Sequence, residues 1–236
     1  MKYILRKNED RWHKQDSWKK SAYAFVPYQT NFGELCGFAE DVVAGGQGFG
    51  LHPHQNMEIT TIVTRGSQRH QDSTGGESVI DASAVQTMSA GTGIRHSEFN
   101  ASATEAVHGF QIWVYPKKAD VVPRYQQFRF RPEEKRNRIL LAISPDEAQG
   151  AVAMNQDACF SLSELEAGHS VRYRLRLPDA GVYIHCVSGA ATVAGETLGA
   201  GDAIGVYETD EVAVSAAASG AELIYVEVLL QRGITL

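Results

Sequence analysis

Residues 48–54 read Gly-Phe-Gly-Leu-His-Pro-His, and residues 91–98 read Gly-Thr-Gly-Ile-Arg-His-Ser-Glu. Each stretch ends in two metal-ligand residues spaced two apart: His52 with His54, and His96 with Glu98. Side chains at positions i and i+2 of a β-strand point to the same face of the sheet. If the two strands are neighbours, three imidazoles and one carboxylate face a single point. That donor set suits a divalent first-row transition metal.

A single pair of this kind is weak evidence, because polar residues alternate on many half-exposed strands. Two pairs, both preceded by glycines and separated by room for a strand, a turn and a strand, predict a bound metal rather than structural histidines. Pro53 lies between two of the ligands and has no N–H to donate. The strand that carries it is therefore expected where sheet pairing is interrupted.

Two carboxylates are candidates for the roles of ligand and catalytic base. Glu98 is assigned to the metal because its spacing from His96 brings it to the same point. Glu58 lies on the face of His52 and His54 if that strand continues regularly. It would then support a ligand or hold a turn amide, and both Glu98 and Glu58 are candidate catalytic bases.

The whole chain consists of short apolar or alternating stretches, rich in β-branched and aromatic residues and separated by Gly, Asp, Ser and Asn. This pattern predicts an all-β protein, with helical turns only at Glu133–Asn137 and Ser161–Glu166. A rhythm of strand, glycine turn, strand and Gly-Asp occurs twice. It predicts two tandem jelly-roll β-barrels, residues 1–135 and 136–236, of which the second lacks ligand pairs and is expected to be metal-free.

Other polar and aromatic residues are open to more than one interpretation. Gln111, Trp113 and Tyr115 share one face of a strand, where they either pack in the core or form the wall of a pocket for an aromatic substrate. His70 and Asp72 lie in a polar segment and are expected in a surface turn. No role is assigned to His13 and His108, which have no partner at ligand spacing.

The net charge of −6 argues against general nucleic-acid affinity. The charge is uneven, since residues 1–33 carry seven Lys/Arg against three Asp/Glu and residues 140–236 carry four against thirteen. We expect these regions to form solvated surfaces of opposite sign that face one another. The chain has neither a membrane-spanning apolar run nor a signal-peptide core. Its three cysteines, Cys36, Cys159 and Cys186, form no CxxC motif, which favours reduced thiols in a cytoplasmic protein.

Residues 48–59 and 88–100, which contain the ligand pairs, resemble the two metal motifs of the pirin family of bicupin proteins. Gln111–Val114 and Pro123–Tyr125 are similar to its bacterial quercetinase-like branch. Residues 17–26 hold only a loose form of the family's aromatic N-terminal stretch, and the second half resembles the family in rhythm alone. The resemblance implies two tandem cupin domains with one metal in the first. By motif, its ligands are His52, His54, His96 and Glu98.

The resemblance also implies a metal-dependent dioxygenase of the quercetin 2,3-dioxygenase type, which opens a flavonol ring with O2. Its cofactor would be one divalent transition metal, Fe(II) first, with Ni, Cu, Zn, Mn and Co as alternatives. Its partners would be a small aromatic, flavonol-like substrate and O2, with no nucleic acid bound directly and no membrane. The alternative is a non-catalytic metal-binding regulator, a redox sensor or transcription cofactor, that acts through a protein partner. An exposed apolar patch beside the metal favours the regulator, and an enclosed cavity favours the enzyme.

Overall fold

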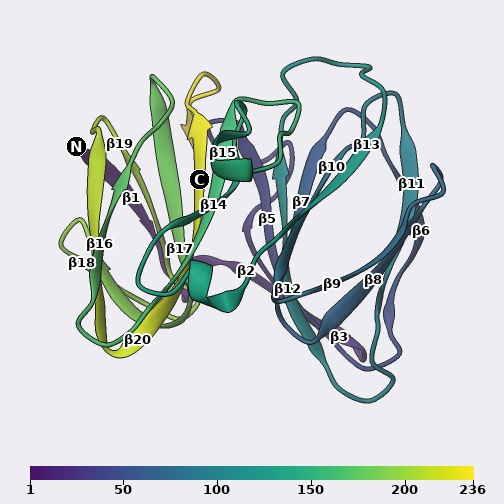
Figure 1. Ribbon diagram of the computed structural model, residues 1–236, viewed down its shortest axis with the longest axis horizontal. Helices are drawn as coiled ribbons and strands as arrows, with labels where there is room; N and C mark the ends of the chain where they lie inside the picture. The colour runs from purple at the N-terminus through teal and green to yellow at the C-terminus, as the bar shows by residue number, and fades with distance from the viewer.

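The computed structural model describes residues 1–236 and confirms the all-β prediction. Two β-rich halves lie side by side along the long axis of the molecule, with the one-turn helix η2 (Pro132–Glu134) between them (Figure 1). Two other one-turn helices are η1 (Asn8–Asp10) and η3 (Ala148–Gly150). Among these helices there is none with the length and apolar character to cross a lipid bilayer.

Two sheets build the first half, and neither closes into a continuous barrel. A nine-stranded sheet runs β13-β10-β7-β12-β5-β3-β2, with β4 paired to β5 and β21 (Ile234–Thr235) paired to β4, and a four-stranded sheet runs β6-β11-β8-β9. The strands of the first half are β2 (Trp12–Gln15), β3 (Lys19–Phe25), β4 (Asn31–Phe32), β5 (Leu35–Val43), β6 (Gly48–His54), β7 (Glu58–Arg65), β8 (Ser67–Asp72), β9 (Glu77–Asp81), β10 (Ala84–Ser89), β11 (Ile94–Asn100), β12 (Val107–Val114) and β13 (Arg124–Arg129).

The second half is one eight-stranded sheet with the order β1-β19-β17-β20-β15-β14, to which β16 and β18 are attached. Its two long strands, β17 and β20, pair with each other along most of the length of β17. The strands are β1 (Lys2–Arg6), β14 (Leu140–Ile143), β15 (Ala158–Leu165), β16 (Ser170–Arg174), β17 (Ala180–Val193), β18 (Glu196–Gly199), β19 (Ala203–Tyr207) and β20 (Glu211–Leu229).

The helical turn expected at Ser161–Glu166 is wrong, because all but the last of these residues belong to β15. Ser161 and Ser163 are buried, and the hydroxyl of Ser163 lies 2.9 Å from that of Tyr225 on the neighbouring strand β20. These serines therefore occupy interior strand positions. The turn expected at Glu133–Asn137 is realised as η2, which begins one residue earlier, at Pro132.

The largest hydrophobic core joins the two halves. It combines Phe38 and Phe110 of the first half with Phe160 and Tyr183 of the second, and the rings of Phe38 and Tyr183 are 5.5 Å apart. A separate core lies within the second half, and two smaller ones lie in the first half, where residues of the nine-stranded sheet pack with Ile94 or Ile80 of the four-stranded sheet. Burial of this shared apolar surface holds the halves together as one unit.

The terminal strands are exchanged between the halves. β1 pairs with β19 in the sheet of the second half, and β21 (Ile234–Thr235) pairs with β4 in the sheet of the first. Lys2 and Lys7, at the two ends of the β1 segment, form ion pairs with Glu208 and Asp202. The basic N-terminal segment thus lies against the acidic second half, as the charge distribution predicts.

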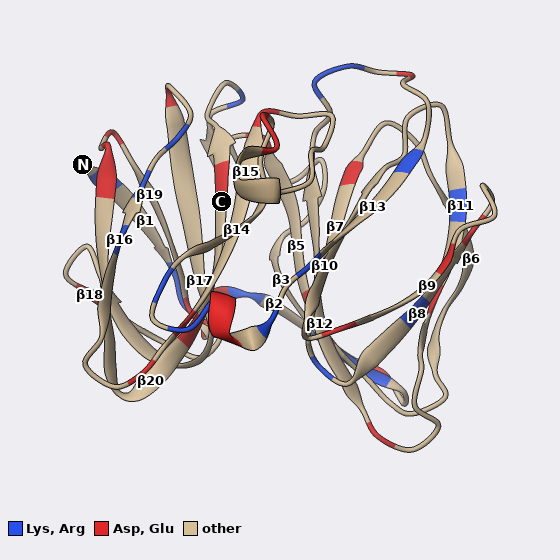
Figure 2. Cartoon of the chain, viewed as in Figure 1, with Lys and Arg blue, Asp and Glu red and all other residues tan.

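Charges of both signs also meet in the segment that joins the halves (Figure 2). The Lys135 Nζ lies 2.5 Å from an Oε1 of Glu222 and 3.7 Å from an Oε2 of Glu164. This connection is where we predict the boundary between residues 1–135 and 136–236. Lys135 therefore has acidic partners in the second half, whereas Arg131 pairs with Glu134 within the connecting segment itself.

Candidate metal centre

The β11 strand alternates strictly between the interior and the solvent. His96, Glu98 and Asn100 are buried, whereas Arg95 and Phe99 point outward. β11 pairs antiparallel with β6, so that His96 lies opposite His52. The register shifts between His96 and Glu98, which offsets the glutamate relative to β6. The two motifs therefore pair regularly from Ile94 to His96 but not at Glu98.

Three imidazoles converge where β6 and β11 meet. One ring nitrogen from each of His52, His54 and His96 lies within 4.8 Å of the other two. Their ring centroids are 4.4 to 4.9 Å apart. The pairing of β6 with β11 therefore brings together all three histidines that the sequence assigns to the metal.

The ring nitrogens of these histidines are arranged as metal ligands require. The Nδ1–H of His52 donates to the Gly50 carbonyl over 2.8 Å, which leaves the Nε2 lone pair free. The Nε2 atoms of His54 and His96 are buried and have no hydrogen-bond partner. Buried polar atoms are almost always satisfied, so these two nitrogens fit a bound cation.

The protonation states agree with this arrangement. Burial, reinforced by the charge of His52, lowers the pKa of His54 from 6.5 to about 4. Burial and the neighbouring histidines lower the pKa of His96 to about 3. Both rings are neutral at neutral pH, which is the form that binds a metal.

Glu98 lies beside His96 but outside the group of three histidines, and its carboxylate is turned toward amide groups. Its Oε2 accepts a hydrogen bond of 2.7 Å from Gln111 on β12, and its Oε1 accepts one of 2.8 Å from Gln68 on β8. Its carboxylate forms a group with His96 and His70, again within 4.8 Å. Burial raises the pKa of Glu98 to about 7.

Glu58 lies apart from the imidazoles. β6 ends at His54, the chain turns through Asn56, and β7 begins at Glu58 in the other sheet. The expectation that Glu58 shares a regular strand with His52 is therefore wrong, because Asn56 adopts a φ of 48° that breaks the strand. The Oε2 of Glu58 accepts hydrogen bonds from the Ser89 hydroxyl and from the backbone N–H of Asn155. Glu58 thereby ties the first half to the second.

The surface turn expected for His70 and Asp72 is also wrong. Both residues belong to β8, and neither side chain is exposed. Their ring and carboxylate are 3.0 Å apart, and the Nδ1 of His70 lies 3.4 Å from the Nδ1 of His96. Burial raises the pKa of Asp72, but hydrogen bonds from Thr74 and His70 outweigh it and lower the pKa. The sequence does hold a signal for this strand: Gln68, His70 and Asp72 are spaced two apart, which puts three polar side chains on one face of a strand.

A cleft of about 190 Å³ opens beside His52 and Glu98. Aromatic rings form part of its walls, and its other polar groups come from β3, β5 and β12. The lining residues are Lys19, Tyr23, Phe25, Pro27, Gly37, Phe38, Ala39, Asp41, Phe49, His52, Glu98, Gln111 and Trp113. Gln111 and Trp113 thus form a pocket wall, as one of the two interpretations proposed, whereas Tyr115 packs under the guanidinium of Arg232 instead.

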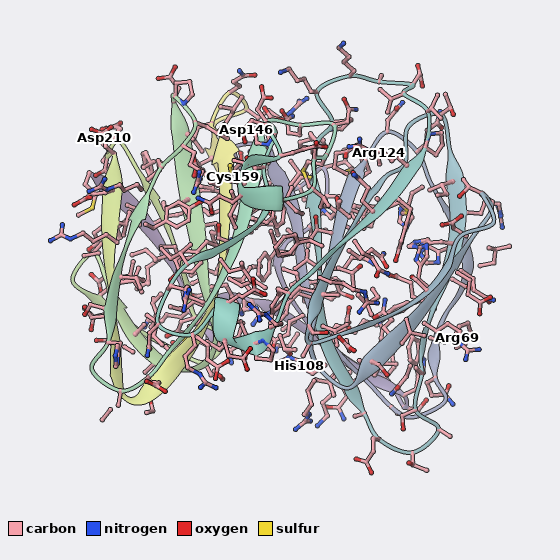
Figure 3. All side chains as sticks on the ribbon, viewed as in Figure 1. Arg69, His108, Arg124, Asp146, Cys159 and Asp210 are labelled. Carbon is pink, nitrogen blue, oxygen red and sulfur yellow. The ribbon has the colours of Figure 1, made fainter.

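A second polar cluster lies between the halves, where Figure 3 places His108. The His108 Nε2–H donates to Glu40 over 2.7 Å, and the guanidinium of Arg11 contacts the other oxygen of Glu40 at 2.6 Å. His185 of the second half is fully buried nearby, and its ring contacts the rings of Phe38 and Phe110 at tilted or edge-on angles. This cluster has a structural role at the interface and lies outside the cleft.

Family profiles match both halves of the chain. The profile described as Pirin covers residues 6–114, and the profile described as the quercetinase C-terminal cupin domain covers residues 141–228. The chain therefore has two tandem cupin domains, as the sequence predicts. The second profile lies entirely in the half for which the sequence resemblance was limited to rhythm.

Individual relatives are similar over nearly the full chain. A quercetin 2,3-dioxygenase of Escherichia coli (strain K12) is 34% identical over 94% of this chain and 96% of its own length. The crystal structure of YhhW from Escherichia coli has a TM-score of 0.89 at 34% identity and covers 96% of this chain and 97% of that one. A structure of bacterial pirin YhhW from Escherichia coli in complex with nickel(II) has a TM-score of 0.88 at 33% identity, covering 97% and 99%. Relatives of this kind support an oxygenase-type enzyme, and the chain belongs to the pirin family.

Proposed function

We propose that this protein is a metal-dependent dioxygenase of the quercetin 2,3-dioxygenase type, which opens a flavonol ring with O2. The observation that carries the proposal is the aromatic cleft that reaches both His52 and Glu98. A planar aromatic substrate in such a cleft would lie with one edge at His52 and Glu98. The activity named for the Escherichia coli relative supports the same assignment.

The proposed ligands are His52, His54, His96 and Glu98, which hold one divalent metal. The unpartnered Nε2 atoms of His54 and His96 fit this role. Glu98 would complete the set if its carboxylate turned from Gln111 and Gln68 toward His96. We expect Fe(II) in the native protein, although the YhhW complex contains nickel(II). When bound, the metal supplies Lewis acidity that favours the ionised form of a substrate hydroxyl.

The residues of the cleft would bind the substrate, limit its contact with water and accept its proton. Tyr23, Phe49 and Trp113 offer flat faces on which an aromatic ring can stack. The largely apolar walls would keep water from the inner edge of a bound ring, which strengthens the electrostatic interactions there. Glu98 lies in the cleft wall and accepts the proton that a flavonol hydroxyl loses on ionisation. The cleft is smaller than the ~300–1,000 Å³ of most ligand pockets, so a flavonol fills it and extends toward the solvent.

The test is an aerobic assay of the metal-reconstituted protein with a panel of flavonols, alongside metal analysis. We expect flavonol consumption coupled to O2 uptake, and no consumption by the metal-free protein. Flavones, which lack the 3-hydroxyl group, are the control substrates and should not react. If the fully loaded protein consumes no flavonol, the proposed activity is wrong.

One observation favours the regulatory alternative. Leu51 on β6 is 60% exposed and Phe99 on β11 is 41% exposed, on the two strands that carry the histidines. Apolar side chains beside a redox-active metal suit a surface that a partner protein reads. In that case Leu51→Ser and Phe99→Ser would weaken partner binding, and the metal-loaded wild type would consume no flavonol. The affinity for a partner would also change with the metal's redox state.

A further inference from the structure

A chain of hydrogen bonds leads from the β8–β9 turn to the three histidines. The Nε2 of His70 lies 3.0 Å from the Oδ2 of Asp72, and its Nδ1 lies 3.4 Å from the Nδ1 of His96. His96 has its other nitrogen, Nε2, buried and without a partner. His70 and the side chain of Asp72 are fully buried.

The direction of each hydrogen bond follows from its acceptor. A carboxylate only accepts, so the proton between His70 and Asp72 belongs to the Nε2 of His70. The neutral ring of His70 then has a lone pair on Nδ1. The proton between the two rings must therefore belong to the Nδ1 of His96. This leaves the Nε2 of His96 unprotonated, which is the form that a metal requires.

The first member of this chain is held in place by the turn. The Oδ1 of Asp72 accepts hydrogen bonds from the backbone N–H of Thr74 over 2.8 Å, from the Thr74 hydroxyl over 2.5 Å and from the N–H of Gly76 over 3.2 Å. Its Oδ2 is thereby aimed at His70. The ring of Tyr125 stacks on His70, with centroids 4.8 Å apart, and holds its plane.

We infer that Asp72 and His70 are positioning residues that select the tautomer and orientation of His96 for the metal. This inference rests on the metal site of the proposed function. Second-layer carboxylates that orient metal-bound histidines usually act on the ligand directly. Here the imidazole of His70 lies between the carboxylate and the ligand. Asp72 fixes which nitrogen of His70 carries the proton, and His70 in turn fixes which nitrogen of His96 carries it.

The geometry argues against His70 as a ligand in its own right, although it lies within 4.8 Å of His96 and Glu98. Its Nε2 is occupied by Asp72, and its Nδ1 faces the Nδ1 of His96 instead of the free Nε2 atoms. A metal between the two Nδ1 atoms would leave the Nε2 atoms of His54 and His96 buried and unsatisfied. The proposed site satisfies both.

Asp72→Asn is the decisive variant. The single oxygen of the amide is needed by the Thr74 and Gly76 N–H groups, so its NH2 group takes the place of Oδ2. This NH2 group donates to the Nε2 of His70 and moves the His70 proton to Nδ1. The Nδ1 of His96 must then accept, and the His96 proton moves to the metal-binding Nε2. The variant therefore inverts the whole chain of hydrogen bonds.

The β9–β10 turn provides a matched control. The Oδ1 of Asp81 accepts hydrogen bonds from the backbone N–H and the hydroxyl of Ser83, much as Asp72 does with Thr74. Asp81 contacts no imidazole. Asp81→Asn therefore reports the cost of the same substitution in a similar turn, without an effect on the histidines.

Gly76→Ala tests the inference without a change of any hydrogen-bonding group. A Cβ at this position would lie 2.5 Å from the Oδ2 of Asp72, so the carboxylate has to move away from His70. The substitution adds no charge and no donor. It should reproduce part of the effect of Asp72→Asn.

The first readout is the tautomer of His96 in the metal-free protein, observed by long-range ¹H–¹⁵N NMR correlation. We expect an Nδ1–H tautomer in the wild type and in Asp81→Asn, and an Nε2–H tautomer in Asp72→Asn. A purely structural role for Asp72 would not move this signal. An Nε2–H tautomer in the wild type, or no change in Asp72→Asn, overturns the inference.

The second readout is the affinity for Ni(II), measured by competition with a chelator. We expect Asp72→Asn to weaken binding about 10- to 100-fold and to keep one metal per chain, in line with other outer-layer partners of metal ligands. Loss of binding as complete in His70→Ala as in His96→Ala would make His70 a ligand and overturn the inference. Neither readout uses flavonol turnover, so a failure of the proposed activity is seen separately.

Discussion

His96 is central to the candidate metal site, because its ring contacts the rings of His52, His54 and His70. We expect His96→Ala and His52→Ala to reduce the metal content from about one ion per chain to nearly none, because each removes a ligand. The strand content should be unchanged, since the hydrophobic cores lack these residues. Metal analysis and circular dichroism of the same samples check this. A loss of the β signal together with the metal would mean that the site is structural.

The two glutamates are expected to differ in their effect on turnover. Glu98→Gln should lower flavonol turnover by at least ~10²-fold, the low end for a lost general base, and weaken metal binding. Glu58→Gln should have a milder effect on turnover, because Glu58 contacts Ser89 and Asn155 and none of the imidazoles. Steady-state kinetics with equal metal loading decide between them. The reverse order would assign the base to Glu58.

Sequence patterns predicted the three imidazoles because i, i+2 spacing is a local property of a strand. They could not predict that the chain bends at Asn56, since this bend depends on its contacts with Gly91 and Asp120 from distant segments. Glu58 was therefore placed on the wrong face. His70 was missed for the same reason, because the pairing of β8 with β11 brings it to His96 across a wide gap in sequence.

At the scale of elements, β5 and β12 carry the charged cluster that supports the interface. Burial by itself raises the pKa of Glu40, but the hydrogen bond from His108 and the charge of Arg11 outweigh it and lower the pKa from 4.5 to about 2. A carboxylate whose pKa is lowered in the folded protein stabilises it fully above the unfolded value. That stabilisation is lost as the pH falls from 4.5 toward 2.

The contribution of Glu40 to stability is therefore about 3 kcal/mol at neutral pH, an order-of-magnitude value from the size of the shift. Glu40→Gln should lower the free energy of unfolding at neutral pH and flatten its pH dependence between pH 4.5 and 2. Urea unfolding of the metal-free wild type and variant at several pH values measures this. Parallel pH profiles for the two proteins would contradict the prediction.

For the second half, the sequence predicted strand β17 better than strand β15. The apolar stretches Val182–Val187 and Ala191–Val193 predict strands, and both lie in β17. Ser161–Glu166 resembles a helical turn instead, because its serines and glutamates are poor strand formers. Tertiary contacts overrode that local preference, since the buried Ser163 finds the hydroxyl of Tyr225. The cleft was only partly predictable, because Lys19, Phe49 and Trp113 come together from three separate strands.

At the scale of the whole molecule, the boundary at residues 135/136 remains a prediction, and it has a direct test. We expect residues 1–135 and 136–236, when expressed separately, each to be unstable. Each would lack a terminal strand that the other part supplies, and both would expose the core that contains Phe38 and Tyr183. Co-expression should restore a folded complex that binds metal. Cooperative thermal unfolding of either part alone would show that the halves are independent.

The exchanged terminal strands also determine the order in which the fold can form. β1 is among the first segments synthesised. Because Lys2 pairs with Tyr207, this strand has no partner until β19 is complete. At the ~5–20 residues per second of translation, this interval lasts about 10–40 s. Contacts between segments so distant in sequence also close slowly, because the intervening chain loses much conformational freedom. During biosynthesis the earliest strand is thus available to wrong partners for longest, and its short, lysine-containing sequence limits that risk.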